Sequence, residues 1–185
     1  MKKIIAVLFI VVFASSMIFA QGHLPNKGNL FVGGKLALIG TGTYSNDIGF
    51  MVNAEMVTQE DFLNLGDIPA SLGFGATFGY AGGDHSIYWH FSRMMIAGSA
   101  YYHADVLKNE KIDTYVVFNL GVDIYTWKWD GVAGVLGDER DTDVDLDFNS
   151  AIGARYFLTD NLALVGEFGW GIGLIRIGAD LMLGK

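Results

Sequence analysis

The chain has 185 residues and a formal net charge of −8, and 51% of its residues are hydrophobic, 14% aromatic and only 17% charged. With 20 acidic against 12 basic residues it does not suit nucleic-acid binding, and because it holds no cysteine, disulfides, thiol chemistry and cysteine-based metal sites are excluded. Ordinary soluble domains are about 25% charged. A chain this apolar therefore either has a large core or turns its strands toward lipid.

The first 20 residues show, in order, the basic, apolar and cleavage regions of a secretory signal peptide. Lys2 and Lys3 precede an unbroken apolar run, Ile4–Ala14, and Ala20 is the expected cleavage site, with Ser16 as the alternative. A transmembrane helix is the competing interpretation, but the strongly apolar run is too short to span a bilayer comfortably. Removal of residues 1–20 leaves 185 − 20 = 165 residues, a single-domain length.

Eight segments of the remaining chain alternate between apolar residues and small or charged ones. In chain order the predicted strands are Leu30–Gly40, Gly49–Thr58, Ala70–Tyr80, Ile87–Ala104, Thr114–Trp127, Thr142–Phe157, Asn161–Trp170 and Leu174–Leu183. Because the side chains of a strand alternate between its two faces, each predicted strand has one apolar face and one small-or-charged face. No stretch of this part approaches 18 consecutive apolar residues, so the sequence predicts no membrane-spanning helix.

The third and sixth predicted strands show the alternation most clearly. In the third, the face opposite Phe74 and Phe78 holds only serine, glycine and threonine, which suits a crowded interior and makes a poor solvent face. The sixth has its polar residues at odd-numbered positions from Asp143 to Arg155, while its even-numbered positions are largely apolar. Such segments, separated by turn residues, are typical of membrane β-barrels.

Eight charged residues lie within the predicted strands on the face opposite the apolar one. Four are basic and four acidic: Lys35, Glu55, Arg93, Asp123, Arg155, Glu167, Arg176 and Asp180. Aromatic residues lie near the strand ends, where membrane interfaces favour them: Phe50, Tyr80, Tyr88 and Trp170 at one set of ends, Tyr102 and Tyr156 at the other.

These patterns predict an all-β fold, an eight-stranded antiparallel up-and-down transmembrane β-barrel, preceded by a cleaved signal peptide. The predicted barrel is apolar outside and charge-paired inside. A soluble barrel of the lipocalin kind, with charge outside and an apolar pocket inside, is the alternative, since alternation alone does not separate the two.

Two stretches resemble a known family. Ala100–Tyr115 has a strand, a turn and a strand, and Gly153–Glu167 is similar to a hairpin with Gly-x-Arg-Tyr-Phe followed by Asn-Leu and Glu. Both are typical of the eight-stranded outer-membrane β-barrel family, which includes OmpA-type, OmpX-type and opacity-type barrels. The resemblance implies an outer-membrane location, loops outside the cell after odd strands and periplasmic turns after even ones. Together with the signal-peptide pattern, it divides the chain into residues 1–20 (signal peptide), 21–29 (periplasmic segment) and 30–185 (barrel).

The interior of such a barrel is just wide enough for side chains to fill it. We therefore expect the eight charges to form a salt-bridged plug, because an unpaired buried charge costs several kcal/mol. Arg155 and Glu167 match the basic and acidic positions of the family's hairpin. A narrow gated pore is the alternative. We expect a non-enzymatic monomer with an envelope-structural or surface-interaction role, with outer-membrane lipid around it, an extracellular ligand at its loops, and no cofactor, metal or nucleic acid.

Two further patterns suggest other chemistry. His90-Phe91-Ser92 has the His-x-Ser form of lipid A deacylases, in which a base activates a serine, so a lipid hydrolase using His90 and Ser92 is a second hypothesis. The segment Lys128–Asp141 leads into alternating aspartates that could bind calcium, although a solvated acidic rim is the simpler interpretation. Trp127 and Trp129 beside it suit membrane anchoring or partner contact. His23 and His103 show no pattern of their own.

Overall fold

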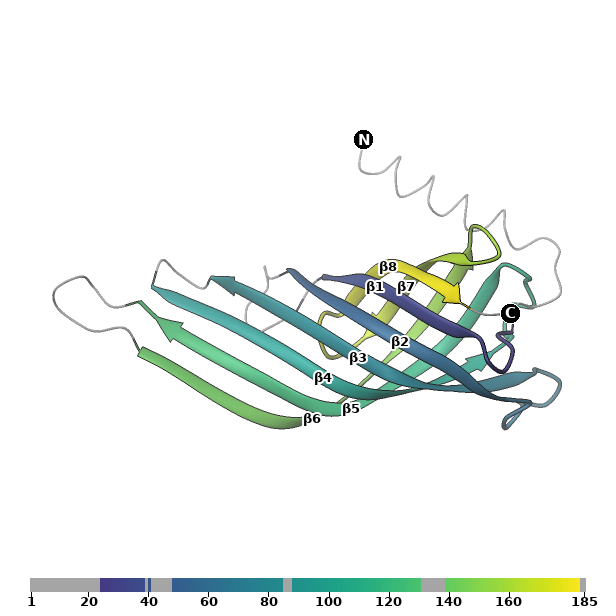
Figure 1. Ribbon diagram of the computed structural model, residues 1–185, viewed down its shortest axis with the longest axis horizontal. Helices are drawn as coiled ribbons and strands as arrows, with labels where there is room; N and C mark the ends of the chain where they lie inside the picture. The colour runs from purple at the N-terminus through teal and green to yellow at the C-terminus, as the bar shows by residue number, and fades with distance from the viewer. Residues whose placement is uncertain (1–23, 39, 41–47, 85–87, 131–138, 184–185) are drawn as a thin grey trace.

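A computed structural model describes residues 24–38, 40, 48–84, 88–130 and 139–183 of the chain. The predicted signal peptide and His23 lie outside the described residues. Eight strands form a closed barrel in which each pairs with the next in sequence and β8 pairs back with β1, all antiparallel (Figure 1). The strands are β1 (Leu30–Leu38), β2 (Ile48–Glu60), β3 (Ala70–Asp84), β4 (Trp89–Ala104), β5 (Ile112–Trp129), β6 (Glu139–Phe157), β7 (Leu162–Gly169) and β8 (Ile175–Leu183). Among the described residues, no helix is both long and apolar enough to cross a membrane.

The prediction of an eight-stranded antiparallel up-and-down barrel is confirmed, but β2, β3, β5 and β6 are longer than predicted. β5 begins two residues earlier than expected and β6 begins at Glu139 rather than Thr142. Both strands continue because they pair with each other without interruption, from Ile112 opposite Tyr156 to Trp129 opposite Glu139. The ladder therefore carries charged residues into strand conformation that a sequence pattern assigns to loops.

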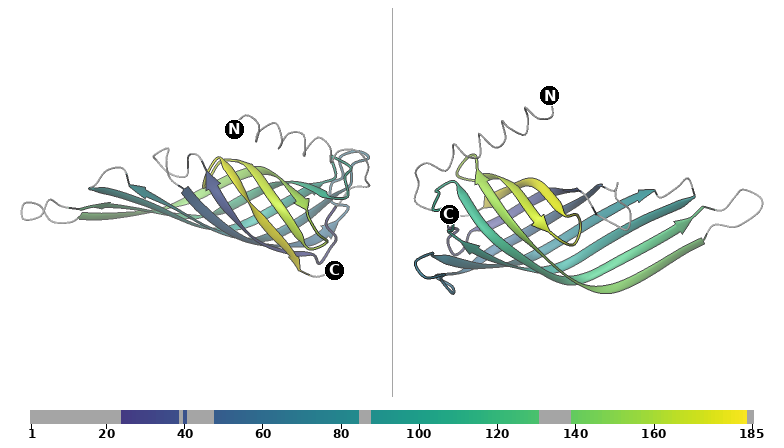
Figure 2. Two further views of the ribbon diagram at one scale, coloured as in Figure 1. Left: turned by 90° about the horizontal axis from the view of Figure 1, so that it is seen from above. Right: turned by 180° about the vertical axis from the view of Figure 1, so that it is seen from behind.

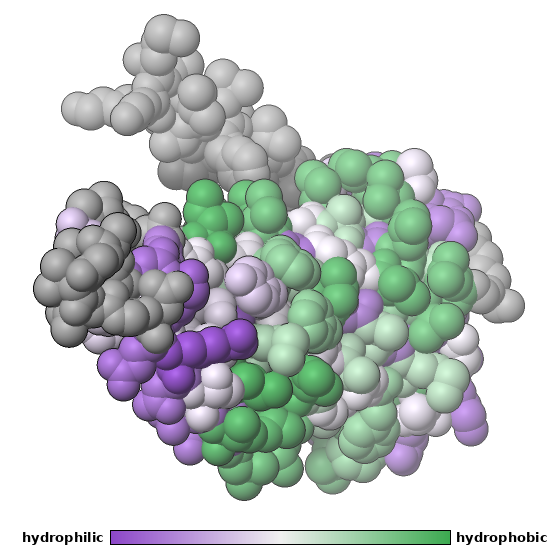
Figure 3. Space-filling view, turned by 60° about the vertical axis from the view of Figure 1, so that its left-hand side comes forward, coloured by the Kyte–Doolittle hydropathy of each residue, from purple (hydrophilic) through white to green (hydrophobic). Residues whose placement is uncertain are grey.

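The outer wall of the barrel is apolar. Large hydrophobic side chains from every strand are exposed on it, among them Leu36, Val52, Phe74, Ile96, Leu120, Ile152, Leu164 and Ile177. Figure 3 shows hydrophobic side chains over much of the barrel wall. Soluble monomers rarely expose contiguous apolar patches beyond a few hundred Å². The charge-outside arrangement of a soluble lipocalin-like barrel is therefore wrong for this chain.

The two ends of the barrel differ. One end, called here the turn end, carries the connections 61–69, 105–111 and 158–161. At the other end β4, β5 and β6 continue past the short β7 and β8 (Figures 1 and 2). As a result, β7 pairs with β6 only from Ala151 to Phe157. We call this continuation the barrel extension and define it as Trp89–Met95, Asp123–Trp129 and Glu139–Asp147.

Candidate functional site

The part of the interior nearest the turn end is organised around Arg155 of β6. Its Nε lies 2.6 Å from Asp180, its Nη1 2.9 Å from Asp113 and its Nη2 2.6 Å from Glu55. None of these side chains is more than 1% exposed. The guanidinium carbon also lies 4.1 Å from the ring centroid of Phe31. One fork-shaped cation thus holds three carboxylates from β2, β5 and β8, geometry for which arginine is better suited than lysine.

His103 of β4 completes this cluster. Its Nδ1 lies 2.9 Å from Asp113 Oδ1 and its Nε2 lies 2.5 Å from Glu55 Oε1. Because an ionised carboxylate only accepts hydrogen bonds, two ionised neighbours require both ring nitrogens to donate, and the imidazole is then a cation. The expectation that His103 has no special role in the barrel was therefore wrong. The alternation places it on the polar face, but only the register brings it to its two acidic neighbours.

Asp113 was missed because it precedes the predicted start of the fifth strand. It lies directly opposite Arg155 in the register of β5 and β6. Asp113, Tyr115 and Asp123 all lie at odd-numbered positions and so on the same face of the strand. This is the one sequence signal that could have placed Asp113 among the interior charges.

A second group of charges lies in the middle of the barrel, where Glu167 of β7 meets two cations. Lys35 Nζ lies 2.5 Å from Glu167 Oε1, and Arg176 Nη1 lies 3.3 Å from Glu167 Oε2. The Tyr115 hydroxyl donates to Glu167 Oε1 at 2.7 Å, and the Tyr115 ring centroid lies 4.6 Å from the guanidinium carbon of Arg155, so Tyr115 contacts both groups. The excess positive charge of the group offsets the excess negative charge around Arg155.

A third group lies toward the barrel extension. Arg93 of β4 donates to the Asp123 carboxylate through both Nε and Nη2, and its Nη1 donates to the Gly171 carbonyl at 3.0 Å. Asp147, whose side chain is 26% exposed, lies 3.5 Å from Arg93. Between this group and Arg155, Thr77, Ser99, Asn119 and Asn149 form a chain of side-chain hydrogen bonds across β3 to β6.

All eight sequence-selected charges are thus buried inside the barrel. His103 adds a fifth cation to their four, and Asp113 adds a fifth buried anion. Among the described residues the buried charges therefore balance, five against five, which is the arrangement that offsets the cost of removing ions from water. We call these ten residues the interior charge network.

Glycines opposite these side chains provide the necessary room. A Cβ at Gly73 would lie 2.4 Å from Glu55 Oε1, and one at Gly33 would lie 1.7 Å from Asp180 Oδ1. A Cβ at Gly153 would meet the Tyr115 ring at 2.4 Å. Glycines of β1, β3 and β6 therefore leave room for two buried acids and an aromatic ring, and Gly73 belongs to the small-residue face predicted for the third strand.

The predicted interfacial aromatics lie on the outer wall. Phe50, Tyr80, Tyr88 and Trp170 are exposed, and the rings of the first two lie 5.7 Å apart between centroids, tilted by 34°. Tyr102 and Tyr156, nearer the turn end, are half-buried, and Tyr102 donates its hydroxyl to the Leu63 carbonyl.

His90 and Ser92 lie on the outer face of β4 in the barrel extension. His90 Nε2 lies 2.9 Å from Asp130 Oδ2, and Lys128 Nζ lies 2.5 Å from Asp130 Oδ1. The Lys128 ammonium holds the pKa of the Asp130 carboxyl below its ordinary value, and His90 acts in the same direction. Within the described part of the chain, the Ser92 hydroxyl makes no hydrogen bond to His90.

The proposed calcium loop lies partly outside the described residues, since 131–138 are among those not described. In the ranges that the structure does describe, no group of three or more histidine, aspartate or glutamate side chains could hold a metal ion. Asp141, Asp143 and Asp145 instead follow one another along an extended strand, on alternate residues.

The fold was compared with known proteins. No protein-family model and no curated protein sequence matches the chain. A de novo designed transmembrane β-barrel superposes with a TM-score of 0.51 at 15% sequence identity, covering 86% of this chain and 99% of the designed one. The chain has the fold of an eight-stranded transmembrane β-barrel.

Two structures of Ail, the attachment invasion locus protein of Yersinia pestis, also resemble this barrel. The crystal structure has a TM-score of 0.48 at 12% identity and covers 85% of this chain and 96% of Ail. The structure in a phospholipid bilayer nanodisc has a TM-score of 0.45 at 14% identity and covers 86% of this chain and all of that one.

Proposed function

We propose that this protein is a non-enzymatic, integral outer-membrane β-barrel, monomeric, with a plugged interior and a role in surface interaction. In this proposal residues 1–20 are a cleaved signal peptide, 21–29 a periplasmic segment and 30–185 the barrel domain. The observation that carries it is the pairing of an apolar outer wall with a charge-balanced interior. The apolar outer wall suits contact with lipid, and the charge-balanced interior suits a barrel without a water-filled path.

The plug rests on the contacts of the interior charge network. Arg155 alone contacts three carboxylates from three strands. Its guanidinium carbon also lies 4.6 Å from the ring centroid of Tyr115, whose hydroxyl donates to Glu167. An ion passing through would have to displace such pairs from a space that side chains already fill. A narrow gated pore would require several of these pairs to break together.

The surface role rests on the shape of the extension end. The sheet there continues beyond β7 and β8 as the barrel extension, whose β6 residues are exposed on both faces (Figure 2). If the even-strand turns are periplasmic, the barrel extension lies outside the cell, where loops and edges carry recognition.

The competing lipid hydrolase would use Ser92 as the nucleophile and His90 as its base. One observation favours it, since Asp130 could orient His90 as an acid orients the base of a catalytic triad. A nucleophile should lie about 2.6–3.2 Å from its base, however, and in the described residues Ser92 does not hydrogen-bond to His90. Lipid A hydrolysis by the purified protein that Ser92→Ala abolishes would establish the hydrolase and contradict the non-enzymatic role.

The proposal is tested by membrane fractionation combined with gel mobility before and after boiling. An outer-membrane barrel is expected in the detergent-extracted outer-membrane fraction, and it should run as a compact band until it is boiled. Release into the soluble fraction without detergent would overturn the proposal, as would a mobility that boiling does not change.

A further inference from the structure

The inward face of the barrel extension carries aromatic rings and carboxylates in two neighbouring columns. The rings of β5 lie on this face at alternate residues, on the same parity as the buried Asp123, and β6 places one acid opposite each ring. The cross-strand pairs are Tyr125 with Asp143, Trp127 with Asp141, and Trp129 with Glu139. Cross-strand neighbours on one face have Cβ atoms about 4.5–5.5 Å apart, so each ring lies next to a carboxylate.

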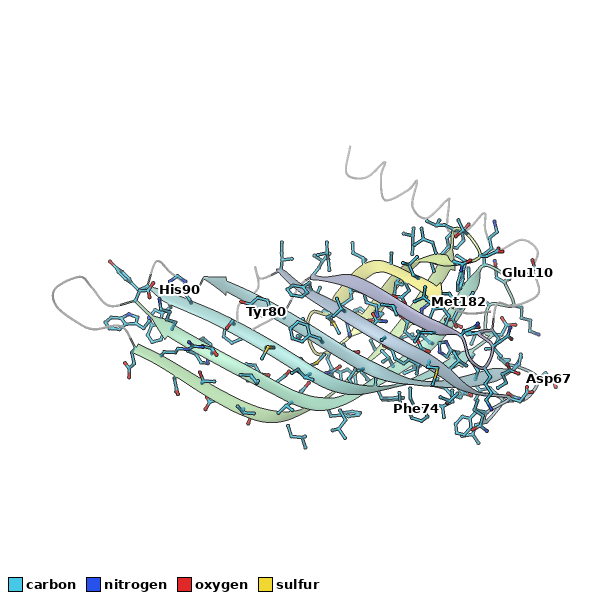
Figure 4. All side chains as sticks on the ribbon, viewed as in Figure 1. Asp67, Phe74, Tyr80, His90, Glu110 and Met182 are labelled. Carbon is cyan, nitrogen blue, oxygen red and sulfur yellow. The ribbon has the colours of Figure 1, made fainter. Side chains whose placement is uncertain are left out.

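Two more rings widen this face toward β4. Trp89 lies opposite Trp129 with 6.4 Å between ring centroids, and Phe91 lies opposite Trp127 with 4.6 Å between them. Trp89 is 46% exposed, and Trp127 and Trp129 are half-buried, so the rings remain open to a ligand. Figure 4 shows the barrel extension at the end of the molecule marked by His90.

Arg93 of β4 is a cation at the base of this face. Its guanidinium carbon lies 5.4 Å from the ring centroid of Tyr125, and its Nε donates to Asp123 at 2.8 Å. A cation over a ring and beside a carboxylate gains from both contacts. Lys128 and Arg140, the other lysine and arginine of the described barrel extension, are even-numbered and lie on its outer face. Beyond Arg93, the described face therefore repeats the ring and the carboxylate without the cation.

The carboxylates of β6 are close enough to repel one another. Asp141, Asp143 and Asp145 are exposed and lie on alternate residues, about 6.6 Å apart along the strand. This spacing is shorter than the electrostatic screening length of about 8 Å at physiological salt. Asp145 also lies opposite Asp123, whose buried Oδ1 accepts no hydrogen bond from the described residues. The face is therefore rich in acceptors and short of donors.

These groups suit a ligand whose polar groups are all donors. The backbone N–H and C=O groups of β5 are used in ladders to β4 and β6, so the face offers a ligand mainly rings and carboxylates. An ammonium group only donates, and methylene groups pack well on aromatic rings. Two amines joined by four methylene groups lie about 6 Å apart when the link is extended, which is close to the spacing of the aspartates.

We propose that the inward face of the barrel extension binds a linear polyamine, a chain of protonated amines joined by short methylene links. The amines pair with Asp141, Asp143 and Asp145, and the methylene links lie across the rings of β5. Ile172 of the β7–β8 connection is fully buried among inward-facing residues of the barrel, so the polyamine binds at the mouth and does not pass through. The inference rests on the proposed function in one respect: the barrel extension must face outside the cell to meet a polyamine there.

The test is isothermal titration calorimetry of spermine, a linear tetra-amine, with the protein folded in a non-ionic detergent. We expect saturable binding at one site per chain, and the affinity should fall as salt is added. Putrescine, a diamine, should bind about tenfold more weakly, because it makes fewer ion pairs and covers fewer rings. Magnesium has the charge of putrescine but no methylene chain, and it should bind more weakly still.

A first set of variants tests the carboxylates. Changing Asp141, Asp143 and Asp145 together to asparagine should weaken spermine binding about tenfold, because three exposed ion pairs are lost. The matched control removes the same charge from three exposed acids of the turn end, far from His90 in Figure 4, and should leave spermine binding unchanged (Asp61→Asn, Asp67→Asn, Glu110→Gln).

A second set tests the rings at constant charge. Trp127→Leu keeps an apolar side chain but removes the ring, so it should weaken spermine binding about two- to fivefold and leave magnesium binding unchanged. Trp127→Phe keeps a ring and should retain most of the affinity. Boiling-dependent gel mobility confirms that each variant is folded.

Absence of saturable spermine binding to the folded protein would overturn the inference. Equal weakening by the aspartate variant and the turn-end control would do the same, because net charge alone would then attract spermine. Magnesium binding as tight as that of spermine, or Trp127→Leu without effect on spermine, would reduce the face to an acidic rim. Fractionation decides the proposed function independently. A protein that binds spermine but is not found in the outer membrane refutes only the proposed function, and the reverse result refutes only this inference.

Discussion

Replacing Arg155 with methionine removes the cation that holds the largest cluster of buried charge. The side chain keeps most of its length, so the change acts mainly on charge and hydrogen bonding. Glu55, Asp113 and Asp180, each no more than 1% exposed, lose a donor at 2.6–2.9 Å. His103 then remains as the one cation in contact with two of these three carboxylates.

The magnitude follows from the number of groups left without a partner. Removing one partner of a buried ion pair costs about 3–5 kcal/mol, because the other charge stays buried and unpaired. Asp180 loses its hydrogen-bonded cation entirely, while Glu55 and Asp113 keep His103. The loss of the cation–π contact with Phe31 at 4.1 Å adds about 1 kcal/mol. We therefore expect Arg155→Met to lower the free energy of unfolding by about 4–6 kcal/mol.

The assay is reversible urea unfolding of the protein in lipid vesicles, followed by tryptophan fluorescence and by gel mobility without boiling. Arg140→Met is the matched control, since Arg140 is exposed in the barrel extension and its replacement should change stability by less than about 0.5 kcal/mol. If Arg155→Met unfolds within about 1 kcal/mol of the wild type, Arg155 does not hold the interior together, and the reasoning fails.

Three further predictions test the same interior. Gly73→Val places a side chain against Glu55, where a Cβ alone would lie 2.4 Å from Oε1, so stability in urea should fall by about 1–3 kcal/mol; unchanged stability would contradict the close packing. In nitrogen-15 NMR of His103 at neutral pH, both ring nitrogens should be protonated, and a neutral ring would disprove the imidazolium assignment. Glu167→Lys sets three cations together and should destabilise the barrel or raise its conductance in planar bilayers; no change in either would refute the role of Glu167.

The fold could be predicted from sequence because period-two alternation is repeated in eight segments. Each strand signal is weak alone, but an apolar face opposite small or charged residues in every strand fits one closed object. The bounds of β5 and β6 were less predictable. Asp113 and Glu139 look like loop residues in sequence, and only the uninterrupted ladder between the two strands keeps them extended.

The candidate site was predicted in part, for a physical reason. The odd or even position of a residue in a strand assigns its side chain to one face, and on this basis Arg155 and Glu167 were placed on the same face as the other charges. Which charges contact one another depends on the strand register and on the closure of the barrel, and the alternation along one strand gives neither. Glu55 and His103 are separated by 48 residues and come within 2.5 Å only because β2, β3 and β4 pair in a particular register. The barrel extension was likewise not predicted, since it results from the unequal lengths of β6 and β7.

The conductance of the purified, folded wild-type protein in planar lipid bilayers tests the plugged interior most directly. Five buried cations paired with five buried anions in a space filled by side chains predict no steady conductance above that of the bare bilayer. A reproducible, ion-selective conductance from the wild-type barrel would contradict the plug and establish a pore instead.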